Sequence, residues 1–238
     1  MKSMARHLLP FALPLALMPV LALSTLTLSV TRSLAGECTY GDDHYLSAIE
    51  QVSRDQSVEN VGAASEAFYC LRCRAEDASK WAGPIASIQF ASCRKSPIRD
   101  RLASACLPLL SDTTTLPNFR VVPRFACALL LGSYGIPKVG ESDIFRIITK
   151  EIPTRRPLAT DDFMSLAVLR DPRTLRFLTN EYEVDSKFPS PRRERRIEDI
   201  INCLYHIPGD SALALVRTIK GKETDPQIQE RCLRVLGR

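Results

Sequence analysis

Two short amphipathic helices joined by a tight turn are predicted at the end of the chain, and they constrain its fold more than any other feature. Asp210 can cap the first of them, and Gly221 can end it in the left-handed conformation. Asp225 followed by Pro226 marks the start of the second, because proline at the first helical position loses no hydrogen bond. Helices this short cannot bury their apolar faces alone, so they need neighbours of the same kind.

The same pattern recurs upstream at regular intervals. A small residue stands at one position of every second predicted helix, in the order Cys127, Ser165, Cys203 and Cys232, at spacings of 38, 38 and 29 residues. An apolar residue follows four places later, and turn or cap residues come after it. The helical periodicity predicts eleven helices, near residues 44–53, 57–75, 79–93, 97–111, 119–133, 141–151, 160–170, 172–183, 192–207, 210–220 and 225–236.

The segments Leu166–Leu178 and Ile200–Gly237 resemble HEAT repeats, the second of them the short HEAT-like repeat of many bacterial proteins. The resemblance covers residues 120–237 well and 57–111 weakly. It implies an all-α fold, an α-solenoid of about five antiparallel helix pairs that is irregular toward the N-terminus. HEAT-like proteins are mostly scaffolds and binding modules. A few short-repeat relatives act on bilin chromophores, but no motif in this sequence supports that chemistry.

Residues 1–35 are predicted to be an export signal, and residues 36–238 a single HEAT-like domain. Two basic residues precede an uncharged apolar run over 8–30, and residues 33–35 place small side chains at the −3 and −1 positions of a cleavage site. The mature chain is therefore expected to be periplasmic or secreted. Because the apolar run is long enough to span a bilayer, an uncleaved membrane anchor is the alternative.

The mature chain carries little net charge. The leader has three basic residues and no acidic one, so the formal net charge of +5 falls to +2 once it is removed. A general basic surface for nucleic acid or membrane is therefore not expected, and membrane contact is expected only if the leader is retained. The HEAT resemblance predicts another protein as the partner, bound through the concave face of the solenoid.

The eight cysteines all follow the leader, and in an exported chain an even number permits disulfides. Cys38 precedes the first helix and could bridge to Cys70 or Cys73 at the end of the second. The cysteines at the recurring small position are expected to stay unbonded. Stacked equivalent helices lie about 8–10 Å apart, which is too far for a disulfide. Three buried thiols are expected there, Cys127, Cys203 and Cys232.

An arginine cluster opens the ninth predicted helix and consists of Arg192, Arg193, Arg195 and Arg196. Basic residues at a helix N-terminus oppose its macrodipole, so the cluster needs another explanation. It is either a solvated face or a contact patch for a partner with an acidic surface, since arginine binds carboxylates with two parallel hydrogen bonds. Arg155 and Arg156 precede the predicted helix 160–170, which also carries the recurring small residue, and they could join that patch.

No catalytic residue, metal site or cofactor is predicted. His206 stands among apolar residues and His44 near the start of the first helix, so both favour packing or capping roles. A zinc site could use Cys70-x-x-Cys73 with two later cysteines, but the spacing fits no common module. A redox centre at the same pair would need its first cysteine at a helix N-terminus, but Cys70 falls late in the predicted helix 57–75.

The alternative to a binding module is a helical enzyme in which carboxylates or cysteines meet in a groove. Phosphate-binding loops and nucleophile-elbow sequences do not occur in the chain. Residues distant in the sequence can still converge in space, so the sequence leaves this alternative open.

Overall fold

Eleven helices and one short hairpin make up the part of the chain that the computed structural model describes, residues 38–72, 83–111, 123–152, 160–187 and 193–237. The all-α prediction is confirmed. The helices are α2 (Asp42–Arg54), α3 (Val58–Cys70), α4 (Pro84–Cys93), α5 (Arg99–Leu110), α6 (Pro123–Ser133), α7 (Ile144–Glu151), α8 (Thr160–Leu169), α9 (Thr174–Lys187), α10 (Arg193–Tyr205), α11 (Asp210–Lys222) and α12 (Pro226–Leu236). Strand β1 (Lys138–Val139) pairs antiparallel with β2 (Ser142–Asp143), so that Val139 lies opposite Ser142.

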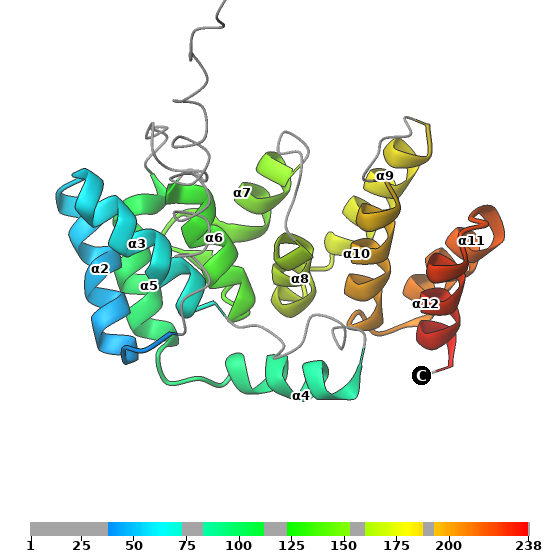
Figure 1. Cartoon of the computed structure of the whole chain (residues 1–238), viewed down its shortest axis with the longest axis horizontal. Coiled ribbons are helices and arrows are strands. Elements are labelled where there is room, and N and C mark those ends of the chain that lie inside the picture. Colours follow the sequence, from blue (N-terminus) through cyan, green and yellow to red (C-terminus); the bar gives the residue numbers. More distant parts are fainter. Residues whose placement is uncertain (1–37, 73–82, 112–122, 153–159, 188–192, 238) are drawn as a thin grey trace, which may run out of the picture. The chain divides into compact units, whose positions relative to one another are not determined.

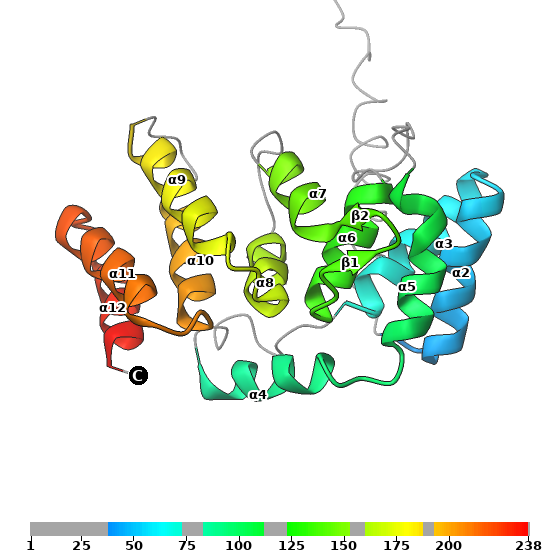
Figure 2. The same cartoon turned by 180° about the vertical axis from the view of Figure 1, so that it is seen from behind.

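Within the compact unit Tyr40–Arg238, the helices pack as successive pairs (Figures 1 and 2). Helix α2 packs on α3, α5 on α6, α7 on α8, α9 on α10 and α11 on α12. One helix of each pair also contacts its counterpart in the next: α3 meets α6, α6 meets α8, α8 meets α10 and α10 meets α12. This row of α3, α6, α8, α10 and α12 is called the inner row below.

The small repeat residues lie within the inner row and are buried, which explains why they are small. Cys127, Ser165, Cys203 and Cys232 are each at most 1% exposed. A methyl group added at Gly132 of α6 would lie 3.3 Å from the Ser165 Cβ, so α6 and α8 approach closely. The Cys203 Sγ donates a hydrogen bond to the Phe163 carbonyl oxygen, 3.3 Å away, and joins α10 to α8.

The three middle helices of the inner row are buried along almost their whole length. Every residue from Phe125 to Ser133 in α6 is buried, as are Asp162–Leu169 in α8 and Arg196–Leu204 in α10. A helix that is apolar on most sides, as α6 is, requires neighbours on most sides. The side chains of these three helices are therefore core rather than open surface.

Helix α4 stands outside the pairs. In both views it runs along the edge of the molecule, across the lower ends of α8 and α10 (Figures 1 and 2). Phe90 is buried against the end of α10, with its ring centroid 5.0 Å from that of His206. Arg94, the C-cap of α4, lies against Gly135, just after α6. Helix α4 thus connects the ends of three inner helices.

Three predicted helix ends, two in α11 and one in α9, need correction. Gly209, with φ of +105°, is the N-cap of α11, and Asp210 lies inside the helix and makes no capping hydrogen bond. Helix α11 continues through Gly221 and ends before Glu223, which has an extended backbone. Helix α9 runs one turn beyond the predicted residue 183, to Lys187.

The predicted start of α12 is confirmed. The Asp225 carboxylate accepts hydrogen bonds from the backbone N–H groups of Gln227 and Ile228, and Pro226 takes the first helical position.

The cysteines divide into bonded and free groups. Cys38, Cys70 and Cys93 are disulfide-bonded. The predicted buried thiols are confirmed, and Cys106 joins them as a fourth. Cys73 and the leader at 1–35 lie outside the described residues. Among the helices that the structure describes, none is long and apolar enough to cross a membrane.

Candidate functional site

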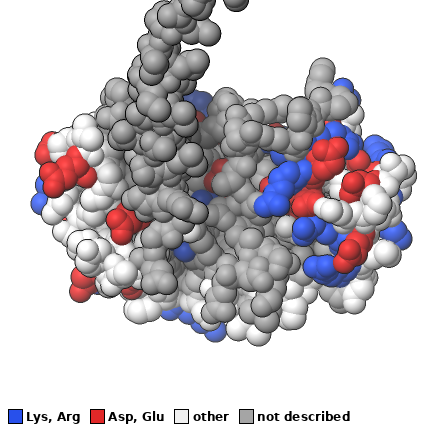
Figure 3. All heavy atoms as spheres, viewed as in Figure 1, with Lys and Arg blue, Asp and Glu red and all other residues white. Residues whose placement is uncertain are grey.

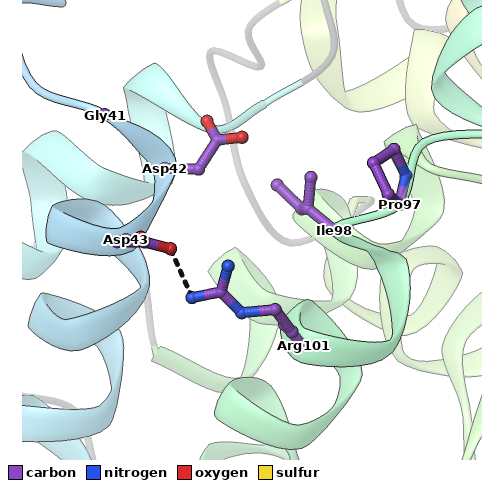
Figure 4. Close-up of a pocket in the computed structure, with 6 residues that line it drawn as sticks. All are labelled: Gly41, Asp42, Asp43, Pro97, Ile98 and Arg101. Atoms are coloured by element: carbon purple, nitrogen blue, oxygen red, sulfur yellow. Dashed lines mark ion pairs between the residues drawn. The ribbon is translucent and has the colours of Figure 1, made fainter.

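A pocket of about 440 Å³ lies between the first turns of α2 and α5 (Figure 4). It is called the α2–α5 pocket, and its described lining consists of Gly41, Asp42, Asp43, Pro97, Ile98 and Arg101. Both helices are amphipathic and pack against each other through buried side chains such as Ile49 and Leu102. Their first turns are left partly uncovered, and this forms the pocket.

One wall of the pocket is an ion pair. The Arg101 guanidinium lies 2.6 Å from the Asp43 carboxylate, and both side chains are exposed. Asp42 comes from the same turn of α2, and its carboxylate projects into the space between the helices (Figure 4). Acidic side chains in the first turn of α2 also suit the positive end of its macrodipole.

Ile98 and Tyr134 add apolar and aromatic surface near Asp42. Ile98 is 8% exposed and lines the pocket beside the exposed Pro97. The Tyr134 hydroxyl donates a 2.7 Å hydrogen bond to the Leu71 carbonyl oxygen. Burial raises the pKa of Tyr134 to about 12, and the nearby Asp42 charge adds to the shift. Tyr134 therefore stays neutral at physiological pH and is a fixed part of the structure behind Asp42.

These groups suit a cationic side chain with an apolar stem. Asp42 supplies a carboxylate, while Pro97 and Ile98 supply surface for methylene groups. Lysine and arginine have this combination of a charged head and an apolar stem. The six described lining residues include two carboxylates and one guanidinium, which can hold a charged ligand.

Two members of the predicted arginine cluster are engaged inside the molecule. Arg196 is 5% exposed; its Nε lies 2.6 Å from the Asp185 carboxylate, and its Nη2 binds Glu181. Arg193 forms a two-pronged pair with Glu223, at 2.6 and 2.8 Å. These arginines therefore hold α9 and the segment after α11 against the start of α10.

The remaining members of the cluster are placed differently. Arg195 is exposed, and it lies 3.9 Å from the Glu198 carboxylate and 3.8 Å from that of Asp199. Arg192, Arg155 and Arg156 lie outside the described residues. An acidic partner at this surface stays a prediction, and of the described arginines in the cluster only Arg195 is exposed enough to contact one.

Several acidic residues are buried at the α9–α12 end of the molecule. On the surface of this end, Figure 3 shows Lys and Arg interspersed with Asp and Glu. Glu181, Asp185, Glu198, Asp199 and Glu223 are each at most 7% exposed. Arg231 of α12 adds an ion pair to Glu198 at 3.2 Å. The charges of this region therefore stabilise contacts between helices.

The other residues considered for chemistry occupy packing positions. His44 stacks on Tyr40 with a centroid separation of 4.1 Å, and His206 packs against Phe90. Burial raises the pKa of the Cys232 thiol to about 11, and it also raises that of Cys203. Within the described ranges no three metal-ligating side chains come together.

The α2–α5 pocket was not predicted from the sequence. Its residues come from two helix starts more than 50 positions apart, and neither start carries a recognisable motif. The acidic pair Asp42-Asp43 was the only local signal, and it also suits ordinary helix capping. No family model, no curated protein and no solved structure matches this chain.

Proposed function

We propose that this chain is an exported, HEAT-like helical-repeat protein that binds another protein as a recognition or scaffold module. The proposal is supported by the packing of successive helix pairs, each against the next. Repeat proteins of this architecture commonly use an extended surface to bind macromolecules.

The α2–α5 pocket is the observation on which the proposal rests. A lysine or arginine side chain of the partner would place its apolar stem on Pro97 and Ile98 and its charge beside Asp42. The sequence prediction placed the partner on the concave face. Because α6, α8 and α10 bury their side chains, the recognising groups in this proposal come from α2 and α5 instead.

Partner capture with matched charge reversals tests the proposal. The full chain, tagged at its C-terminus, is expressed in its native host, cross-linked, purified and analysed by quantitative mass spectrometry. Asp42→Arg should reduce recovery of a specific partner about tenfold or more, since it replaces an attractive charge by a repulsive one. Glu66→Arg makes the same charge change at an exposed position of α3, outside the pocket, and should leave recovery unchanged.

Equal recovery with both variants would show that the pocket does not recognise a protein. A direct contact can be confirmed independently by placing a photo-reactive residue at position 97, which is exposed and lines the pocket. The cross-linked partner peptide should contain a lysine or arginine.

A further inference from the structure

A second, smaller cavity lies where α4 crosses the ends of α8 and α10, and it is called the α4 cavity. Its volume is about 30 Å³, which is room for one or two small polar groups. Three elements contribute to its lining, which consists of Ser87, Phe90, Arg94, Ala167, Val168, Arg170 and His206.

The two arginines of this cavity have no acidic partner among the described residues. Neither Arg94 nor Arg170 forms an ion pair anywhere in the described ranges, whereas Arg173 and Arg193 approach carboxylates to within 2.6–2.8 Å. Burial lowers the pKa of Arg94, and the charge of Arg170 lowers it further, so the two guanidinium groups repel each other. Such a pair at one cavity gains stability from an anion between the two charges.

Arg170 also has an unusual backbone. Its φ is +55°, and it is the only residue other than glycine with a positive φ in the part of the chain that the structure describes. Helices commonly end in this conformation, but usually with a glycine, as Gly135 shows just after α6, with φ of +66°. An arginine retained in a conformation that favours glycine suggests a role for its side chain.

Ser87 and His206 add hydrogen-bonding groups beside the two arginines. The Ser87 Oγ lies 3.0 Å from the His206 Nδ1, so the two side chains already meet at the cavity. The carbonyl ends of α4, α8 and α10 offset part of the charge, because each helix end carries about half a negative charge. Three such ends leave an excess of about half a positive charge at the site.

We propose that the α4 cavity binds a small inorganic oxyanion of the phosphate or sulfate type. The anion lies at the mouth of the cavity, where Arg170 and Ser87 are exposed, and accepts hydrogen bonds from the guanidinium groups of Arg94 and Arg170. Because Arg94 follows α4 and Arg170 follows α8, the bound anion fastens α4 to the end of α8, while the Ser87–His206 contact joins α4 to the end of α10. This site is independent of the α2–α5 pocket and of any protein partner.

Titration of the full chain with sodium phosphate tests this site, with sodium chloride adjusted to hold the ionic strength constant. Isothermal calorimetry should give saturable binding, and hydrogen exchange should slow in α4 at saturation. Arg94→Gln should weaken binding about tenfold, the loss expected for one charge-assisted hydrogen bond. Arg217→Gln, at an exposed position of α11, is the matched control and should bind phosphate as the wild type does.

Arg170→Gly is a second test variant, which removes the guanidinium group without straining the backbone. Glycine accepts the positive φ without strain, so this variant should fold at least as well as the wild type while losing saturable phosphate binding. Equal phosphate binding by Arg170→Gly and the wild type would overturn the proposal. So would an effect of sodium chloride equal to that of phosphate, because this would show ionic screening only.

Discussion

Among the described glycines, Gly135 combines a positive φ with the closest packing around its Cα. Its φ is +66°, and a Cβ there would lie 2.7 Å from the Arg94 Cγ. Gly135→Ala should therefore lower the free energy of unfolding by about 1–3 kcal/mol, through backbone strain and displacement of Arg94. Urea denaturation followed by circular dichroism measures the change.

Gly62 provides the matched control within α3. A Cβ at this position would have no heavy atom within 4 Å, and the residue is helical. Gly62→Ala should raise the free energy of unfolding by about 0.5–1 kcal/mol, because alanine loses less backbone entropy in a helix. A similar loss in both alanine variants would rule out the special conformation of Gly135 as the cause.

The free cysteines should be chemically inert in the folded protein. Cys106, Cys127, Cys203 and Cys232 are buried, and burial raises the pKa of the last to about 11, so little thiolate forms at pH 8. Iodoacetamide at pH 8 should label these four only after unfolding, and Cys38, Cys70 and Cys93 only after unfolding and reduction. Rapid labelling of Cys232 in the native protein would contradict its burial.

The sequence predicted the buried thiols of Cys127, Cys203 and Cys232 correctly, because small size at a close helix contact is a local property of each helix. It did not predict the role of Arg196. Nothing near that residue in the sequence indicates Glu181 and Asp185, which come from α9 on either side of its predicted end. The cluster of arginines is visible in the sequence, but whether one of them is buried depends on the helix that packs against it.

At the scale of the element, Arg196 and Arg195 are adjacent residues of α10 with opposite surroundings. Arg196→Met should cost about 3–5 kcal/mol, since it leaves the buried carboxylates of Glu181 and Asp185 without their countercharge. Arg195→Met should change stability by less than about 1 kcal/mol, because its side chain is 61% exposed. Equal costs in chemical denaturation would contradict the buried role of Arg196.

The start of α9 is joined to the hairpin and α7 by Arg173. Its guanidinium binds Asp143 of β2 and Asp171 at 2.7–3.0 Å, and it lies 4.4 Å from the centroid of the Phe145 ring. These hydrogen bonds lower the pKa of both carboxyl groups. Their contribution to stability is therefore present at neutral pH and is lost as the pH falls through the lowered pKa values.

Arg173→Met should lower the free energy of unfolding by about 1 kcal/mol at pH 7, a modest value because Arg173 is 51% exposed and screened by solvent. The difference from wild type should shrink as the pH falls below about 4, where both carboxyl groups become protonated in the variant. Arg176→Met, at an exposed position of α9, is the control and should show no such pH dependence. A difference that stays constant from pH 7 to pH 3 would exclude the ion pairs as its source.

At the scale of the whole molecule, the periodicity of the sequence predicted the number and order of the helices in the described residues. The start of α12 depends on a local signal, Asp225-Pro226, which the structure confirms. The position of α4 could not be predicted in this way. Its sequence is apolar on several sides, so no single face indicates a neighbour, and its contacts come from residues such as His206, more than 100 positions away.

Helix α4 should couple helix pairs that a simple stack would leave to unfold separately. In a repeat protein, stability is approximately a sum over nearest neighbours. Here Phe90 packs at the end of α10, Arg94 lies against Gly135 after α6, and the α4 cavity is lined by the end of α8. Loosening α4 should therefore affect all three helix ends at once.

Phe90→Ala tests this coupling, because Phe90 is 2% exposed and its loss should cost about 3–5 kcal/mol. Native-state hydrogen exchange should then speed up together at the ends of α6, α8 and α10. Ile88→Ala, on the same helix but 69% exposed, should leave their exchange unchanged. Faster exchange in α4 alone would mean that the pairs are held by their neighbours only, and that α4 rests on them without joining them.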